Sequence, residues 1–354
     1  PDDATGEIIV VIDGKNYTGN VSNGTGSVDI PPLDKGIHNI TVIYPGDDKY
    51  DPVIKEGNIT VDVNKDAILV VDDVLMIYHD GSKLTVLLKD FYGNPIVNAT
   101  VTITINGMSY SRVTDKDGYA FLTLNLDSGD YVATVVYPGD DYYNGAEVNA
   151  SVKIIQSIIG ENIVKMYQNG TQFFANFTDS HGNPLANTTV KFNINGVFYE
   201  KTTNGAGIAR LNINLRPGEY ILTAYNPVTG EQEGFNITVK APISENHDII
   251  KYYKNGTQYT AKVYNKDGTL AVGKNVTFNI NGVFYNRTVD KNGIVTLAIN
   301  LNPGKYIITA IYDGYSVGNN VTVESTLITN DLSMNMQDGS KFNATVLNEQ
   351  GKPL

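Results

Sequence analysis

Residues 189–225 read TVKFNINGVFYEKTTNGAGIARLNINLRPGEYILTAY, and this stretch decides the fold. Apolar and polar residues alternate in TVKFNI, which is the two-residue period of a strand with one buried face. Asn195-Gly196 then supplies the two residues with positive φ that a tight hairpin turn needs. The alternation resumes in ARLNINL, and RPGEY turns the chain into another strand. The stretch therefore predicts two β-hairpins in series.

Similar sequences occur three more times, at residues 278–312, at 103–137 and, with more differences, at 10–44. Self-similarity at a regular spacing is the signature of a repeat protein. One unit has about 85–95 residues, which suits a sandwich of roughly seven strands better than a solenoid repeat. Strand-forming residues are abundant, including 23 Tyr, and no long segment has helical periodicity. We therefore predict an all-β chain of tandem sandwiches.

The repeats divide the 354 residues into five parts. We expect a first domain at 1–65 that lacks its first two strands, whole repeats at 66–155, 156–241 and 242–325, and the first two strands of a further repeat at 326–354. Each whole unit is long enough to bury its own small core. The first domain lacks the two strands that the last part of the chain carries. We therefore expect either a piece of a longer array or head-to-tail strand exchange between molecules.

Composition excludes several classes of protein. There is no cysteine, so neither a disulfide framework nor thiol chemistry is expected. The net charge of −12 and the pI near 4.8 argue against nucleic acid or an anionic membrane as partner. No apolar run approaches the ~18 residues of a membrane-spanning helix, and no signal peptide is recognisable. The four His lie in different units or loops, and no catalytic motif is present, so we expect no enzyme activity.

A Gly-x-Tyr corner precedes one strand of each whole repeat. The corner tyrosines are Tyr131, Tyr220 and Tyr306, and the first unit has His38 at the same place. In immunoglobulin-type sandwiches such a Tyr hydroxyl bonds back to the backbone and fixes the corner between two strands. We therefore assign these tyrosines a structural role, and predict tandem immunoglobulin-like seven-stranded β-sandwiches arranged as an elongated array.

The units also resemble a known family. IDGKNY and YPGDDKY in the first unit, the N-x-N-G hairpin, the PG-x-Y corner and Gly118, Gly207 and Gly293 are similar to bacterial-type immunoglobulin-like repeats of group 3. Such repeats occur in adhesin-like surface proteins of methanogenic archaea, and the resemblance covers essentially the whole chain. It implies exposure at the cell surface or cell wall, but it specifies the fold more closely than the partner.

Asn-x-Ser/Thr motifs, the acceptor sequons for N-glycosylation, are frequent. With 40 Asn and 46 Ser plus Thr, chance predicts about 5 sequons, whereas the chain has 16. They begin at Asn16, Asn20, Asn23, Asn39, Asn58, Asn98, Asn149, Asn169, Asn176, Asn187, Asn236, Asn255, Asn275, Asn286, Asn320 and Asn343. Glycan attachment explains the excess, but so does a polar strand face, because residues i and i+2 share one face.

Acidic turns leave calcium open as a cofactor. PGDD recurs at residues 45–48 and 138–141, and Asp115-Lys-Asp117-Gly118 resembles half of a calcium loop. A full site needs about six or seven oxygen ligands, and no distal Glu stands at the required spacing. Asp and Gly are also the usual residues of turns, which is the interpretation we favour. No other cofactor is expected.

Lys165 and Lys251 lie in the first strands of their units, and Asn236 and Asn320 lie in the last strands. Lys–Asn isopeptide bonds are known in surface sandwiches, but the second unit has no Lys in its first strand. We therefore interpret both lysines as outward-facing surface residues.

These features predict a non-catalytic extracellular adhesin or stalk that mediates or spaces cell adhesion. Its expected partners are an unknown cell-surface protein or glycan and the neighbouring repeats of the same array. Two alternatives stay open: accessory domains of a surface enzyme, and a carbohydrate-binding module.

Overall fold

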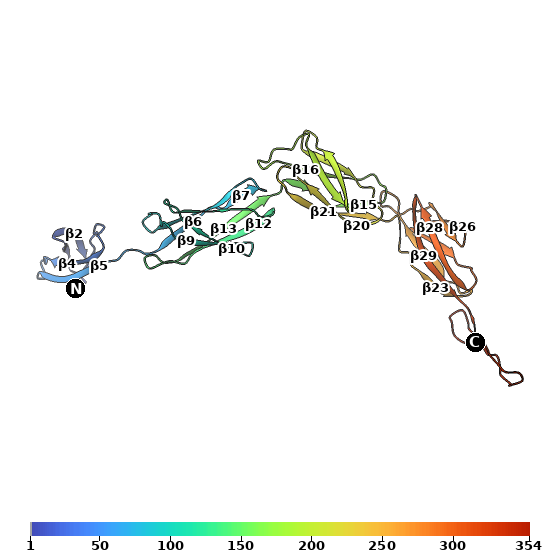
Figure 1. Ribbon diagram of the computed structural model, residues 1–354. Coiled ribbons are helices and arrows are strands. Elements are labelled where there is room, and N and C mark those ends of the chain that lie inside the picture. Colours follow the sequence, from blue (N-terminus) through green and yellow to red (C-terminus); the bar gives the residue numbers. More distant parts are fainter. Residues whose placement is uncertain (1) are drawn as a thin grey trace. The chain divides into compact units, whose positions relative to one another are not determined.

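The computed structural model describes residues 2–354, and in this range the chain forms strands, turns and loops without any helix (Figure 1). The all-β prediction is therefore confirmed. Within the same range no helix is long and apolar enough to cross a membrane.

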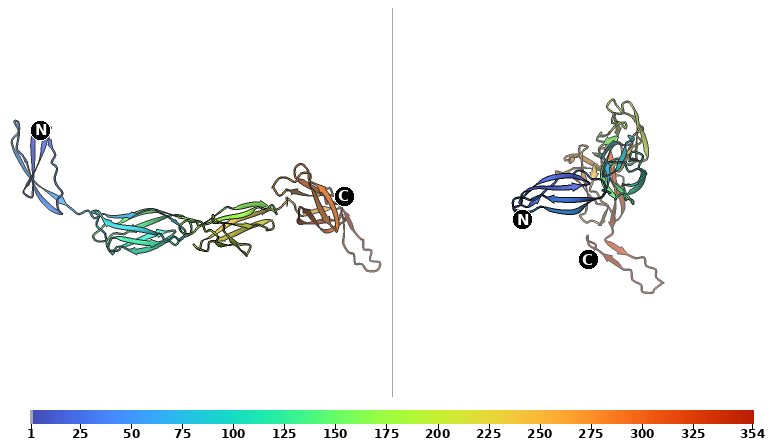
Figure 2. Two further views of the ribbon diagram at one scale, coloured as in Figure 1. Left: turned by 90° about the horizontal axis from the view of Figure 1, so that it is seen from above. Right: turned by 90° about the vertical axis from the view of Figure 1, so that its left-hand side faces the viewer.

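The first unit is one five-stranded sheet with the order β3-β2-β1-β4-β5 (Figure 2, blue). Its strands are β1 (Gly6–Ile12), β2 (Lys15–Ser22), β3 (Thr25–Gly26), β4 (Gly36–Tyr44) and β5 (Val53–Val61). A single sheet cannot cover both of its own faces. Accordingly, Ala4 and Ile12 are the only apolar side chains of residues 2–65 that are fully buried.

The second unit has two sheets. A three-stranded sheet has the order β11-β8-β6, and a five-stranded sheet has the order β10-β9-β12-β13-β7. The strands are β6 (Ala67–Val71), β7 (Val74–Ile77), β8 (Lys83–Asp90), β9 (Thr100–Ile105), β10 (Met108–Val113), β11 (Tyr119–Thr123), β12 (Gly129–Tyr137) and β13 (Ala146–Ile155).

The third unit repeats this plan, with sheets β14-β16-β19 and β15-β21-β20-β17-β18. Strand β16 of one sheet and strands β20 and β21 of the other can be followed in Figure 1. The strands are β14 (Ile158–Gly160), β15 (Ile163–Met166), β16 (Gln172–Phe177), β17 (Thr189–Ile194), β18 (Val197–Thr202), β19 (Ile208–Asn212), β20 (Gly218–Tyr225) and β21 (Gln232–Lys240).

The fourth unit has sheets β22-β24-β27 and β23-β29-β28-β25-β26, and a last pair, β30-β31, follows it. The strands are β22 (Ile243–Ser244), β23 (Ile249–Tyr252), β24 (Gln258–Val263), β25 (Asn275–Ile280), β26 (Val283–Thr288), β27 (Ile294–Ala298), β28 (Gly304–Tyr312), β29 (Tyr315–Glu324), β30 (Leu327–Thr329) and β31 (Ala344–Val346). Each whole unit is thus two packed sheets of the immunoglobulin-like kind.

The hairpin of β17 and β18 forms as its sequence predicts. Ile194 pairs with Val197 across a two-residue turn, in which Asn195 has φ 54° and Gly196 has φ 77°. Both central residues have positive φ, which is the requirement of the tight turn. The inward residues of β17 join Phe173, Phe177 and Leu222 in the core of the third unit.

The first strand of each whole unit differs from the prediction, because it is split between the two sheets. In the third unit β14 pairs antiparallel with β16, whereas β15 pairs parallel with β21. The break falls at Glu161-Asn162, and at Asp72-Asp73 in the second unit. Exposed polar residues favour a crossing point between sheets, since they do not have to enter the core.

Candidate functional site

The corner tyrosines lie close to the backbone that precedes them. The Tyr220 hydroxyl donates to the Arg216 carbonyl at 2.9 Å, and the Tyr306 hydroxyl donates to the Asn302 carbonyl at 2.9 Å. A Cβ added to Gly218 would lie 3.2 Å from the Tyr220 hydroxyl, which explains the glycine two residues before the tyrosine. Both rings pack partly against their cores. A structural role for Tyr131, Tyr220 and Tyr306 remains our interpretation.

His38 makes the matching bond in the first unit. Its Nε2 lies 2.7 Å from the Asp34 carbonyl oxygen, four residues back, as in the tyrosine corners. Its Nδ1 lies 2.7 Å from Asp13 Oδ2. The Asp34 carbonyl and, next, the Asp13 carboxylate raise the pKa of His38, because both favour the protonated ring.

We expect the first unit to lose stability as the pH rises. The folded pKa of His38 lies above the 6.5 of the free side chain, so its contribution is complete below pH 6.5 and is lost as the pH rises through the folded pKa. Hydrogen exchange of residues 36–44 in the full chain, compared at about pH 6 and about pH 8 after correction for intrinsic exchange, measures this. His38→Tyr should remove the dependence, and equal protection of the wild type at both pH values would contradict the prediction.

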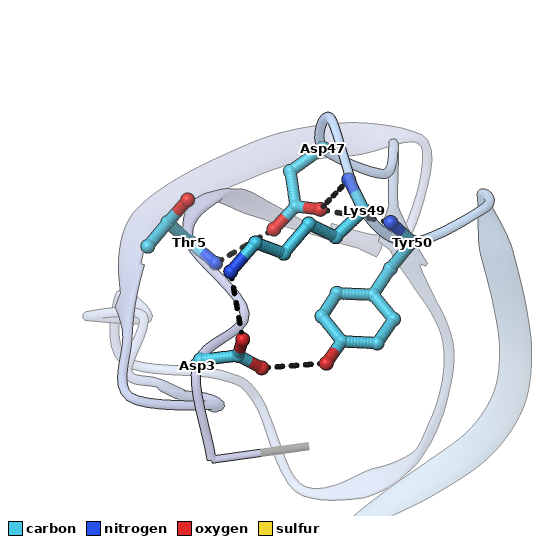
Figure 3. Close-up of polar contacts among 5 residues, drawn as sticks. All are labelled: Asp3, Thr5, Asp47, Lys49 and Tyr50. Atoms are coloured by element: carbon cyan, nitrogen blue, oxygen red, sulfur yellow. Dashed lines mark hydrogen bonds and ion pairs between the residues drawn. The ribbon is translucent and has the colours of Figure 1, made fainter.

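The PGDD turns use their first Asp to hold the backbone (Figure 3). Asp47 Oδ1 accepts from the N–H groups of Lys49 and Tyr50 at 2.8 and 2.9 Å, and Oδ2 accepts from the Thr5 N–H at 2.9 Å. These bonds, led by that of Thr5, lower the pKa of Asp47 to about 2. Nearby, Asp3 accepts from Lys49 Nζ at 2.9 Å and from the Tyr50 hydroxyl at 2.5 Å (Figure 3).

The second unit repeats this use of the motif. Asp140 Oδ1 accepts from the N–H groups of Tyr142 and Tyr143 at 2.8 Å each, while Oδ2 accepts from the Tyr137 hydroxyl at 2.9 Å. Asp115 Oδ1 likewise accepts from the Asp117 and Tyr119 N–H groups. These carboxylates act as turn-holding groups. Within residues 2–354 no three His, Cys, Asp or Glu side chains gather in a way that could hold a metal ion.

The prediction that Lys165 and Lys251 face outward is wrong. Their side chains are buried, with exposed fractions of 4% and 3%. Lys165 Nζ donates to the carbonyls of Ile213 at 2.7 Å and Thr171 at 3.2 Å. Lys251 Nζ donates to the carbonyls of Ile299 and Asn255, at 2.7 Å each, and of Thr257. Each lysine therefore links a strand of the five-stranded sheet to the chain leaving β19 or β27 of the other sheet.

Carbonyl groups replace a carboxylate partner at both lysines. Burial lowers the pKa of each, since it disfavours the charged ammonium. The isopeptide partners considered above lie elsewhere: Lys165 is in register with Val239, three residues from Asn236, and Lys251 is in register with Val323, three residues from Asn320. An odd offset along a strand places two side chains on opposite faces. The asparagines are exposed and the lysines buried, so no bond can form between them.

Sequence reasoning missed a buried polar cluster in the third unit. Glu231 Oε2 accepts from Ser157 Oγ at 2.7 Å and from the Ile158 N–H at 3.2 Å, and its Oε1 is buried without a hydrogen-bond partner. Asn226 Nδ2 and Thr229 Oγ1 also contact Ser157 Oγ, at 3.0 and 2.7 Å.

All four side chains of this cluster are at most 7% exposed. Their hydrogen bonds fix the loop between β20 and β21 to the start of β14. The sequence signal was the longer loop NPVTGE, where the fourth unit has only the turn Asp313-Gly314.

The sequons differ in accessibility. Thirteen of the sixteen asparagines are exposed, whereas Asn169, Asn176 and Asn255 are half-buried. Asn176 lies in β16, between two strands, and its Oδ1 is buried without a hydrogen-bond partner. Asn169 and Asn255 instead hold turns, each accepting from the N–H of the Thr two residues on.

Comparison with known proteins gives no matching family profile. Among solved structures, the chain is similar to a Ca²⁺-stabilised adhesin with which an Antarctic bacterium binds ice, with 18% identity over 92% of this chain and 90% of that one and a TM-score of 0.22. The I9–I11 tandem of titin shows 16% identity over 73% and 98%, with a TM-score of 0.26. Invasin, a bacterial integrin-binding protein, shows 15% identity over 93% and 74%, with a TM-score of 0.24.

These scores are low, so the assignment of the fold rests on the sheets themselves. The paired sheets and the repeated corners define an all-β protein made of tandem immunoglobulin-like sandwiches.

Proposed function

We propose that this chain is a non-catalytic part of an extracellular surface protein of the adhesin type, which holds a binding partner away from a cell surface or cell wall. The observation that carries the proposal is the tandem repetition of separately cored sandwiches. The third and fourth units each bury their own set of sixteen apolar side chains. A series of modules with independent cores adds length without adding a new site, which is what a spacer requires.

The unusual polar groups also support a structural role. The buried lysines and the Ser157–Glu231 cluster lie inside their units, where they join elements of one sandwich. The partner that we propose is a cell-surface protein or glycan, bound by the array or by a module that it carries. The sequence resembles repeats of archaeal surface proteins, which is consistent with a location at the cell surface.

Surface labelling of the native organism tests the proposal. Antibodies raised against the 354-residue chain should label intact cells, and protease added outside should release fragments of the chain. Soluble chain added to an adhesion assay then separates two roles: competition indicates that the repeats bind, and no competition indicates that they space. Labelling that requires opened cells would contradict the proposal.

A further inference from the structure

A sequon asparagine recurs at one position of the sheet in three units. In the third unit Asn236 of β21 lies opposite Ile221 of β20, and in the fourth unit Asn320 of β29 lies opposite Ile307 of β28. In the first unit Asn58 of β5 has the same place, opposite Asn39. Ile221 and Ile307 each directly follow a corner tyrosine, so the two sites are equivalent. A random excess of sequons would not select one register position.

The surface around these two asparagines is unusually apolar. Ile221 is 66% exposed and Ile307 is 64% exposed, although they lie in the middle of a sheet. On the other side of the sequon strand, Val164 lies opposite Thr238 and is 63% exposed, while Ile250 lies opposite Thr322 and is 73% exposed. Each Asn-x-Thr pair therefore lies between two exposed aliphatic side chains. The second unit has the same exposed pair, Leu75 and Val132, but Ser151 stands in place of the asparagine, so only the third and fourth units combine this aliphatic face with a sequon.

Each site also has a shallow groove beside the asparagine. The groove of the third unit has a volume of about 530 Å³ and is lined by Tyr220, Ile221, Asn236 and Thr238, among others. The groove of the fourth unit has about 590 Å³ and is lined by Tyr306, Ile307, Asn320 and Lys305, among others. The exposed aliphatic side chain and the polar groups beside it are together suited to the mixed apolar and hydroxylated surface of a sugar.

We propose that Asn236 and Asn320 are N-glycosylated and that the first sugars of each glycan lie in these grooves, over Ile221 and Ile307. The inference rests on the proposed function, since the chain must meet glycosylation enzymes on its way to the surface. The donor is a sugar activated as a glycosyl phosphate. Nδ2 attacks the anomeric carbon, the bond from that carbon to the phosphate oxygen breaks, the phosphate leaves, and Nδ2 loses one proton.

The bonds around the two asparagines are compatible with this modification. Asn320 Nδ2 donates to Asp248 Oδ2 at 2.9 Å. A glycosylated amide keeps one N–H, so this bond can persist beside the sugar. At Asn236 it is the backbone N–H that donates, to Asn162 Oδ1 at 2.7 Å, and the residue is exposed.

Asn176 supplies an internal control. It has a complete sequon, Asn176-Phe-Thr178, and belongs to the same unit as Asn236. Its Oδ1 is buried, and a Cβ added to Gly207 would lie only 3.0 Å from that oxygen. Asn176 is half-buried whereas Asn236 is exposed, so we expect a glycan at Asn236 rather than at Asn176. The proposal therefore separates two sequons of one unit, which a bias of strand faces toward Asn and Thr does not.

Site-resolved mass spectrometry of the full-length protein from its native source tests the inference. We expect glycopeptides at Asn236 and Asn320 and unmodified peptide at Asn176. Thr238→Ala should remove one glycan mass from the intact protein, whereas Thr238→Ser, which keeps the sequon, should retain it. Without that glycan Ile221 is uncovered, so we expect Thr238→Ala protein to bind more of a hydrophobic dye than Thr238→Ser protein.

The outcomes separate this inference from the proposed function. Unmodified Asn236 and Asn320 in a protein that labels on intact cells overturn the inference and leave the surface assignment standing. Equal modification of Asn176 overturns the role of the grooves. Sugar at both sites in a protein found only inside cells would overturn the surface assignment instead.

Discussion

Replacing Lys165 by alanine should lower the free energy of unfolding of the third unit by roughly 2–4 kcal/mol. The change deletes charge-assisted hydrogen bonds to the carbonyls of Ile213 and Thr171 and leaves the buried Ile213 carbonyl without its partner. It also removes the methylene stem of a side chain that is only 4% exposed. Hydrogen exchange with mass spectrometry on the full chain, as a function of urea, reports the third unit separately from the others.

Two controls sharpen this test. Lys165→Met places the residue that the second unit has at the corresponding position, where Met76 is 2% exposed. It keeps the packing and loses the hydrogen bonds, so it should cost less than alanine. The fourth unit, with Lys251 intact, should keep its wild-type protection. Unchanged exchange of β15 and β21 in Lys165→Ala would show that the lysine does not hold the two sheets together.

Alkaline pH should destabilise the fourth unit far more than the third, and the buried Tyr259 makes the largest contribution. Burial raises the pKa of Tyr259 to about 12, from 10 in the unfolded chain. Its contribution is therefore complete below pH 10 and is lost as the pH rises through 12. Two units of pKa correspond to about 2–3 kcal/mol. Protection of the fourth unit against exchange or urea should fall accordingly between pH 10 and about 12.

The third unit is the matched reference, because Phe173 stands where the fourth has Tyr259. The buried lysines are common to both units, so their titration cancels in the comparison. Tyr259→Phe should remove the part of the extra sensitivity that comes from this hydroxyl, together with the hydrogen bond that it donates to Asn319 Oδ1 at 2.7 Å. The remainder comes from Tyr252, Tyr312 and Tyr315, whose pKa values are also raised. If the two wild-type units lose protection equally over this pH range, burial in the fourth unit does not raise the pKa of Tyr259.

The repeats and the alternation of residues were enough to predict the sandwiches, because the core needs a strict two-residue period. Phe192 and Phe278 are inward by that rule, and both are fully buried. The rule does not place Lys165 on either face, because Ile163, Val164 and Met166 around it in β15 are all apolar. Residue-type preference placed this lysine outward. The preference failed because the carbonyl groups that satisfy this ammonium come from Ile213 and Thr171, far along the chain or in a loop, and no local pattern marks them.

The split of the first strand and the Ser157–Glu231 cluster were not predictable for a related reason. Both depend on which sheet a short segment joins after the sandwich has closed. Glu161-Asn162 is an ordinary polar pair in the sequence, and Glu231 has partners more than seventy residues away. The sequons were visible from the start, but their accessibility was not. Asn176 and Asn236 have equivalent motifs, but Asn176 of β16 is half-buried whereas Asn236 of β21 is exposed.

The parallel pairing of β15 with β21 has a mechanical consequence. The two strands run in the same direction through four successive pairs, from Ile163 with Ile237 to Met166 with Lys240. A force that pulls the third unit by its two ends draws β15 and β21 in opposite directions along their common axis. The backbone hydrogen bonds between the two strands are then loaded in shear at the same time, so they must break together and not one after another. The fourth unit repeats the arrangement in β23 and β29, so each of these two units resists tension in the same way.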